Sequence, residues 1–255
     1  MAGGLRPIVI IPARLAARRL PGKPLADIAG TPMIVHVLRR AQEAAVGPVV
    51  VACAEREIAQ AVERAGGQAV LTRPDHPSGS DRVQEAVERV DPAHRHDVVV
   101  NLQGDLPTID PAVIHAALLP LADPGVDIGS VAYRVSDPAE LANPNVTKVA
   151  AGFAPGRRVA RALYFSRLAV PYGAGEHYHF PGIYAYRRAA LARFVALPPS
   201  VLELRESLEQ LRALEAGMRI DVALIDSIPF GVDTPADLAR AREMLAGSGG
   251  TGGSS

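Results

Sequence analysis

Cysteine and aromatic residues are scarce in this 255-residue chain, and tryptophan is absent. The single cysteine, Cys53, cannot form an internal disulfide or build a thiolate zinc site. We therefore expect a reducing compartment, the cytoplasm, and a cofactor bound through oxygen or nitrogen. Aromatic residues make up 4% of the chain, which leaves little for stacking on nucleic-acid bases.

An excess charge of either sign and long hydrophobic runs are missing as well. The 27 basic and 27 acidic residues give a formal net charge of zero, so no overall field attracts nucleic acid or an anionic membrane. No segment approaches the ~18 uninterrupted apolar residues of a membrane span, and the first residues lack the pattern of a signal peptide. We expect neither a membrane nor a nucleic-acid partner. Residues 247–255 have Gly/Ser linker composition and are expected to form a flexible tail.

Lysine is rare: of the 27 basic residues only Lys23 and Lys148 are lysines. Two interpretations stay open. The two lysines either mark sites that need a compact ammonium group, or they survive by drift in codon usage.

Short apolar, β-branched runs alternate with segments whose apolar residues have helical spacing in the first half of the chain. This alternation predicts a parallel sheet with helices on both faces, right-handed crossovers, and ligands at the carboxyl ends of the strands. The predicted strands are residues 7–12, 48–52, 68–71 and 97–102, and the predicted helices are 33–44, 55–65 and 81–90, the last capped by Ser80 or Asp81.

The pattern loosens from Val126 onward. We expect a second lobe here, at about 126–215, instead of a continuation of the sheet, between a first part at about 7–125 and a closing strand and helix at 218–246. All three belong to one domain, 1–246. The predicted strands are 126–135, 146–150 and 158–164 as a hairpin, 182–187 and 220–224, and the predicted helices are 188–196, 203–216 and 234–245.

A basic loop follows the first predicted strand and carries Arg14, Arg18, Arg19 and Lys23. Phosphate oxygens need several donors and positive charges together, so this loop indicates either a triphosphate site or a solvated basic surface. Gly22 beside Lys23 allows close backbone approach. The loop matches neither the Walker A motif nor the GxGxxG fingerprint.

Eight segments together carry a family resemblance. They are PAR with RLPGKPL and GTPMIVH (12–36), TRPDHPSGSDR (72–82), NLQGDLP (101–107), NPN (143–145) with Lys148, ALYFSR (162–167), GIYAY (182–186), LEQLR (208–212) and GVDTP (231–235). In this order they resemble the 3-deoxy-manno-octulosonate (Kdo) cytidylyltransferases, the CMP-Kdo synthetases. The resemblance covers essentially residues 7–246. It implies an α/β, Rossmann-like, mixed and mostly parallel sheet of the nucleotide-diphospho-sugar transferase type, with a smaller dimerisation and acceptor lobe.

The resemblance also implies an activity. A cytidylyltransferase of this family activates Kdo with CTP, giving CMP-Kdo and pyrophosphate for lipopolysaccharide biosynthesis. The resemblance further implies that Mg²⁺ is the cofactor and that the protein is a homodimer. Two alternatives stay open: a cytidylyltransferase for another acidic sugar of the sialic-acid kind, or an engineered or non-catalytic scaffold of the same fold.

The resemblance assigns roles to single residues as well. It implies that Arg14, Lys23 and Asp105 are catalytic and that Asp105 and Asp233 hold the metal; magnesium prefers one or two carboxylates with substrate phosphates and water. The implied nucleotide-binding residues are Ala13, Arg14, Lys23, Ser78, Gly79, Arg82 and Gln103, and the implied acceptor-binding residues are Arg167, Tyr184, Glu209 and Gln210.

Structural explanations compete with several of these roles. Residues 78–82 also suit an ordinary helix cap followed by a surface arginine, and Glu209 and Gln210 also suit a solvated helix face. Asp233 also suits a helix start, because Thr234 and Pro235 are typical N-cap and N1 residues.

The chain departs from the family pattern at three places. Arg18 replaces a small hydroxyl residue, and Ala52-Cys53-Ala54 replaces Ala-Thr-Asp. Phe180 and Pro181 stand where the family has a histidine two residues before Gly182; His179 is one position too early. Phenylalanine cannot hydrogen-bond a sugar hydroxyl and proline lacks a backbone donor, so the sequence leaves the acceptor open.

Overall fold

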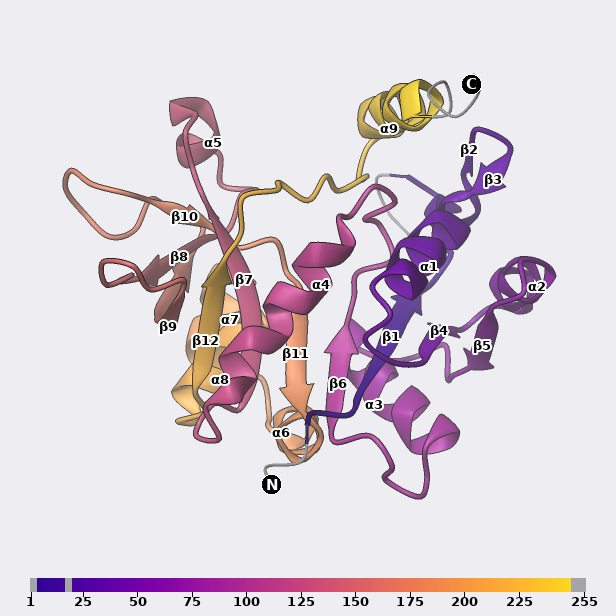
Figure 1. Ribbon diagram of the computed structural model, residues 1–255, viewed down its shortest axis with the longest axis horizontal. Helices are drawn as coiled ribbons and strands as arrows, with labels where there is room; N and C mark the ends of the chain where they lie inside the picture. The colour runs from indigo at the N-terminus through magenta and orange to yellow at the C-terminus, as the bar shows by residue number, and fades with distance from the viewer. Residues whose placement is uncertain (1–3, 17–19, 249–255) are drawn as a thin grey trace. The chain divides into compact units, whose positions relative to one another are not determined.

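The computed structural model describes residues 4–16 and 20–248 (Figure 1). The contacts of the chain define two compact units, each built from separate segments. Among the described residues, unit 1 comprises 4–5, 96–100 and 112–228, and unit 2 comprises 6–95, 101–111 and 229–248. These units interleave along the chain, so they differ from the sequential parts 7–125, 126–215 and 218–246, which stay a functional prediction. Arg18, Arg19 and residues 249–255 of the expected tail lie outside the described residues.

Unit 2 contains three parallel strands, β1 (Pro7–Ala13), β4 (Val49–Cys53) and β5 (Gln68–Leu71), in the order β1-β4-β5 (Figure 1). β1 and β4 are almost fully buried, as their continuous β-branched sequence predicts. The helices are α1 (Met33–Glu43), α2 (Arg56–Arg64), α3 (Gly79–Val90) and α9 (Pro235–Ser248). A short 3₁₀ helix, η1 (Lys23–Leu25), precedes the hairpin of β2 (Asp27–Ile28) and β3 (Thr31–Pro32).

Unit 1 contains a mixed sheet in the order β10-β8-β9-β12-β7-β11-β6. β7 pairs parallel with β12 and antiparallel with β11, and the predicted hairpin of β8 and β9 is confirmed. The strands are β6 (Val98–Asn101), β7 (Ile128–Arg134), β8 (Lys148–Ala151), β9 (Val159–Ser166), β10 (Tyr178–His179), β11 (Tyr184–Arg187) and β12 (Ile220–Leu224). The helices are α4 (Pro111–Leu118), η2 (Leu119–Ala122), α5 (Pro138–Ala142), α6 (Arg188–Ala196), α7 (Val201–Glu206) and α8 (Gln210–Glu215).

The expectation that the chain leaves the sheet after Val126 is wrong. β11 neighbours β6, and β7 neighbours β11, so these later strands continue the sheet. Gly129 interrupts the apolar run of β7 for a packing reason: a Cβ atom there would lie 2.4 Å from the carbonyl oxygen of Ala117. The small residue therefore permits close approach of α4 and does not weaken the strand.

The helix predicted at 203–216 is also wrong in its extent. α7 begins at Val201, after a capping box between Ser200 and Glu203, and ends at Glu206. Ser207 then adopts a left-handed conformation, with a φ of 54°, and α8 begins only at Gln210. Two short helices with a kink replace the single helix.

Among the described residues, no helix is both long and apolar enough to cross a membrane.

Candidate active site

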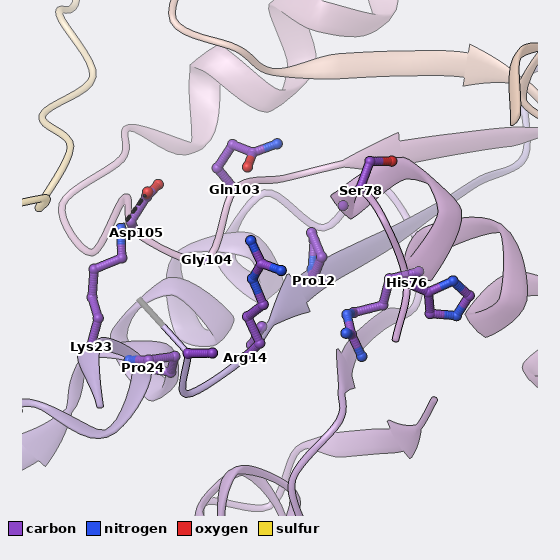
Figure 2. Close-up of a pocket in the computed structure, with 13 residues that line it drawn as sticks. Pro12, Arg14, Lys23, Pro24, His76, Ser78, Gln103, Gly104 and Asp105 are labelled. Atoms are coloured by element: carbon purple, nitrogen blue, oxygen red, sulfur yellow. Dashed lines mark hydrogen bonds and ion pairs between the residues drawn. The ribbon is translucent and has the colours of Figure 1, made fainter. Parts of the chain in front are cut away.

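A cavity of about 780 Å³ lies in unit 2, at the carboxyl end of β1 (Figure 2). Segments far apart in the sequence supply its walls. The lining residues are Pro12, Ala13, Arg14, Ala16, Lys23, Pro24, His76, Ser78, Gly79, Arg82, Gln103, Gly104 and Asp105. Every residue implied for the nucleotide is among them. The structure thus brings this predicted set together, while the role of each residue stays a prediction.

The floor of the cavity depends on close contact between two strand-end loops. Gly104 follows β6, and a Cβ atom at this position would lie 2.9 Å from the carbonyl oxygen of Pro12 at the end of β1. Any larger residue would push the two loops apart. Gln103 is next to Gly104, and Arg14 is two residues after Pro12. Both side chains extend along the same cavity (Figure 2).

Lys23 contacts both carboxylates that the sequence selected. Its ammonium nitrogen lies 2.8 Å from Oδ2 of Asp105 and 3.0 Å from Oδ1 of Asp233. Burial lowers the pKa of Lys23, but the charges and hydrogen bonds of Asp105 and Asp233 outweigh burial and raise this pKa above its ordinary value. The structure therefore brings these three residues together, while their catalytic and metal-binding roles stay predictions. Gly22, with a φ of 69°, turns the chain into η1 and so directs Lys23 toward this point.

Asp233 is positioned by the start of α9. Thr234 and Asp237 exchange hydrogen bonds: the Thr234 backbone N–H donates to Asp237 at 2.9 Å, and the Asp237 N–H donates to the Thr234 hydroxyl at 3.2 Å. The backbone N–H of Val232 donates to the carbonyl of Asp105 at 2.9 Å, which ties the two aspartate loops together. Thr234 and Asp237 thus serve the helix start, and the side chain of Asp233 reaches Lys23.

The start of α3 combines a helix cap with a buried cation. Ser78, and neither Ser80 nor Asp81 as predicted, is the N-cap, because its hydroxyl accepts the Asp81 N–H at 3.2 Å. Arg82 is 2% exposed and donates to the hydroxyl of Thr72, so the interpretation as a surface arginine is wrong. Burial lowers the pKa of Arg82, because a charged guanidinium is less well solvated at the cavity wall than in water.

The four residues implied for the acceptor lie in unit 1. Tyr184 is buried and donates its hydroxyl to Oε1 of Gln210 at 3.2 Å; burial raises its pKa well above the ordinary value. Gln210 is 4% exposed, so a solvated helix face is wrong for this residue. Glu209 is half-buried at the N-cap position of α8.

Arg167 stabilises the kink between α7 and α8. Its guanidinium donates to the backbone carbonyls of Glu206 at 3.0 Å, Ser207 at 3.0 Å and Pro144 at 3.2 Å. Among the described residues, backbone carbonyls accept three of its five N–H groups, which leaves two for the sugar carboxylate that the resemblance assigns to it.

Two departures from the family pattern fill the core. Cys53 is buried in β4, and burial raises the pKa of its thiol to about 11. Phe180 is 5% exposed, with ring centroids 4.8 Å from Phe165 and 5.4 Å from Tyr184. His179 is hydrogen-bonded to Glu140 at 2.6 Å. Phe180 thus belongs to an aromatic cluster that the family pattern in the sequence did not reveal.

His76 and Glu55 were not singled out from the sequence. His76 lines the cavity and pairs through Nε2 with Glu85, whose pKa is lowered: burial opposes this shift, and the hydrogen bonds from His76 and Arg73 outweigh it. His76 lies inside the resembling segment 72–82, which was the available signal. Glu55 carries no motif, and only its contact with Leu15 reveals it.

The comparisons with known proteins agree with this geometry. The family model described as cytidylyltransferase matches residues 8–220. A 3-deoxy-manno-octulosonate cytidylyltransferase from Paramagnetospirillum magneticum is 63% identical over 241 residues, covering 94% of this chain and 98% of the relative. One from Methylobacterium radiotolerans is 66% identical, covering 94% and 97%.

Solved structures are similar to this chain as well. A CMP:2-keto-3-deoxy-manno-octonic acid synthetase complexed with CTP is 40% identical, with a TM-score of 0.87 and coverage of 95% of this chain and 99% of that chain. A 4-diphosphocytidyl-2C-methyl-D-erythritol synthase from Anaerococcus prevotii, 12% identical with a TM-score of 0.63, covers 96% and 100% and shares the fold. The fold and the matches define a nucleotidyltransferase with a Rossmann-like α/β fold. Within that class, the chain belongs to the 3-deoxy-manno-octulosonate cytidylyltransferase family of cytidylyltransferases.

Proposed function

We propose that this chain transfers the cytidylyl group of CTP to Kdo, giving CMP-Kdo and pyrophosphate. The observation that carries the proposal is the ammonium of Lys23, shared by Asp105 and Asp233 at a cavity that Arg14 and Arg82 also line. Cations and carboxylates side by side suit a triphosphate that arrives with a divalent cation. The names of the relatives and the CTP complex of the similar structure support the same reaction.

In this proposal the cationic side chains hold the triphosphate. Arg14 supplies fixed N–H donors, and Lys23 is a compact cation that follows the departing pyrophosphate. The anomeric hydroxyl of Kdo attacks the α-phosphorus in line and gives up its proton to the solvent, a new P–O bond forms, and the bond to pyrophosphate breaks. Positioning and charge neutralisation supply the catalysis, without a covalent enzyme intermediate.

Mg²⁺ is the cofactor that we propose for this site, with Asp105 and Asp233 as its protein ligands. The donor set fits, because two carboxylates from separate loops already share one cation beside the cavity. When bound, the ion would neutralise phosphate charge and lower the pKa of the attacking hydroxyl. Lys23 must then leave the carboxylates, and the triphosphate is the anion that it would meet.

The polar side chains of the cavity wall would recognise cytosine. The Ser78 hydroxyl and the Gln103 amide offer donors and acceptors, and Gln103 itself is held by Asn101 at 3.4 Å. A site built from such groups disfavours the uracil edge, because mismatched donors and acceptors lose their hydrogen bonds. For the acceptor we keep Arg167, Tyr184, Glu209 and Gln210 as the proposed binding residues.

Pyrophosphate release tests this proposal directly. The purified chain should release pyrophosphate with CTP, Kdo and Mg²⁺, and should lose this activity with UTP, with a sialic acid, or after EDTA. Release with sialic acid and none with Kdo would support the alternative acceptor. CTP binding without any release would support the non-catalytic scaffold.

The biological setting follows from the same proposal. CMP-Kdo made in the cytoplasm would supply lipopolysaccharide biosynthesis, and we propose a homodimer, as the resemblance implies. Light scattering coupled to size exclusion measures the mass in solution, and a monomer mass at micromolar concentration would contradict the dimer.

A further inference from the structure

Glu55 does not line the cavity, yet its carboxylate holds the loop that does. The backbone N–H of Leu15 donates to Oε1 of Glu55 at 3.1 Å. Leu15 stands between Arg14 and Ala16, and both of these neighbours line the cavity. The hydrogen bond therefore fixes the backbone next to Arg14.

The same residue connects this loop to Lys23. The carbonyl of Leu15 accepts the backbone N–H of Gly22 at 3.2 Å, and Gly22 is the N-cap of η1, which begins at Lys23. Leu15 is thus held by a carboxylate on one side and by the Lys23 turn on the other. Any shift of Leu15 would displace both cationic side chains of the proposed triphosphate site.

Glu55 is itself well placed for this task. It occupies the N-cap position of α2 in an extended conformation, but its side chain makes no capping hydrogen bond. Its second oxygen, Oε2, is buried and finds no partner among the described residues. The carboxylate is therefore not a solvated surface group, and its negative charge raises the pKa of the buried Arg82 against the effect of burial.

We propose that Glu55 is a positioning residue for CTP: through Leu15 it holds the backbone that carries Arg14 and Lys23, so that both side chains can reach the triphosphate. The inference rests on the proposed function and adds a specific consequence. Loss of the acceptor at position 55 frees the loop, and CTP must then order it on binding. The affinity for CTP falls, whereas the KM for the sugar, whose proposed residues lie in unit 1, stays the same.

Three variants separate the hydrogen bond from the charge. E55Q keeps an acceptor oxygen at the same reach, E55D keeps the charge but withdraws the oxygen by one methylene, and E55A removes both. E57A is the matched control, because Glu57 is an exposed glutamate in the same first turn of α2. CTP affinity is measured by calorimetry without sugar, alongside the thermal midpoint and the two KM values.

We expect E55A and E55D to weaken CTP binding about ten- to hundredfold, since a hydrogen bond to a charged acceptor is lost, and E57A to bind as wild type. E55Q should stay within about threefold of wild type. If E55A does not fold, E55D and E55Q still decide the question. Wild-type affinity in E55D, or an equal loss in E55Q and E55D, would overturn the proposal. A wild-type chain that binds no CTP would refute the proposed function itself, and the inference with it.

Discussion

Lys23 and Asp233 come from opposite ends of the chain, yet the Lys23 ammonium nitrogen lies 3.0 Å from Oδ1 of Asp233. The same nitrogen lies 2.8 Å from Oδ2 of Asp105. A compact cation therefore already stands between the two carboxylates that we propose as metal ligands. Lysine and a divalent ion must compete for this position, since both need the same carboxylates.

Removal of Lys23 should strengthen metal binding to the free protein. In K23M the two carboxylates lose their cation, so we expect Mn²⁺, titrated by electron paramagnetic resonance without nucleotide, to bind roughly tenfold tighter than in wild type. K23R keeps the charge and is the control, with affinity close to wild type. Equal Mn²⁺ affinity in K23M and wild type would show that the lysine does not compete.

Asp105 should be needed for turnover. D105N keeps the size of the side chain but removes the negative charge that faces Lys23, so we expect pyrophosphate release to fall by at least about a hundredfold and Mn²⁺ binding to weaken. D226N, which changes an exposed carboxylate paired with Arg158, is the control and should retain activity. Full activity in D105N would refute its role as ligand.

The Glu203–Arg212 ion pair should make stability depend on pH in the acid range. Burial raises the pKa of Glu203, but hydrogen bonds from Arg212 and the Ser200 backbone outweigh this and hold the pKa below its ordinary value. The stabilisation that the ionised Glu203 contributes is complete above its unfolded-state pKa, about 4.3. It is lost as the pH falls through the lower pKa of Glu203 in the folded state.

The variant E203Q tests this ion pair. The side chains of Glu203 and Arg212 are both largely buried, so loss of the negative charge leaves the Arg212 cation buried without its partner. We expect a loss of roughly 3 kcal/mol in the free energy of unfolding at pH 7, and a smaller difference from wild type near pH 3. D226N breaks an exposed pair and should cost less than ~1 kcal/mol. Urea unfolding at both pH values measures this, and a pH-independent difference would contradict the charge-based explanation.

Phe180 should matter for stability. F180H places an imidazole among Phe165 and Tyr184, where the ring loses aromatic packing, and we expect a loss of roughly 2–4 kcal/mol in the free energy of unfolding. F180M nearly conserves volume and should cost less than about 1.5 kcal/mol. The family pattern predicts in addition that a histidine at position 180 improves Kdo turnover, and the turnover of F180H with Kdo tests this separately. A stable F180H with a lower KM for Kdo would contradict the stability prediction and support the family pattern.

Several elements could be predicted because their signals are local. The apolar run of β6 and the apolar spacing of α6 each lie within a few residues, so the sequence reveals them at nearly the observed bounds. The sequence predicts the strand β7 as well, at 126–135, but its place in the sheet and the kink at Ser207 depend on distant partners. Gly129 is small because Ala117 packs against it, and the Ser207 carbonyl is held by Arg167.

The sequence by itself determined which charged side chains are available to the site. Arg14, Lys23 and Asp105 follow predicted strands, and parallel strands gather such loops at one edge. Only the tertiary structure decided that Lys23 is shared by two aspartates, that Arg82 is buried and that Glu55 holds Leu15. These contacts join residues far apart in the chain, and no local pattern specifies such a pairing, because packing of the whole unit sets it.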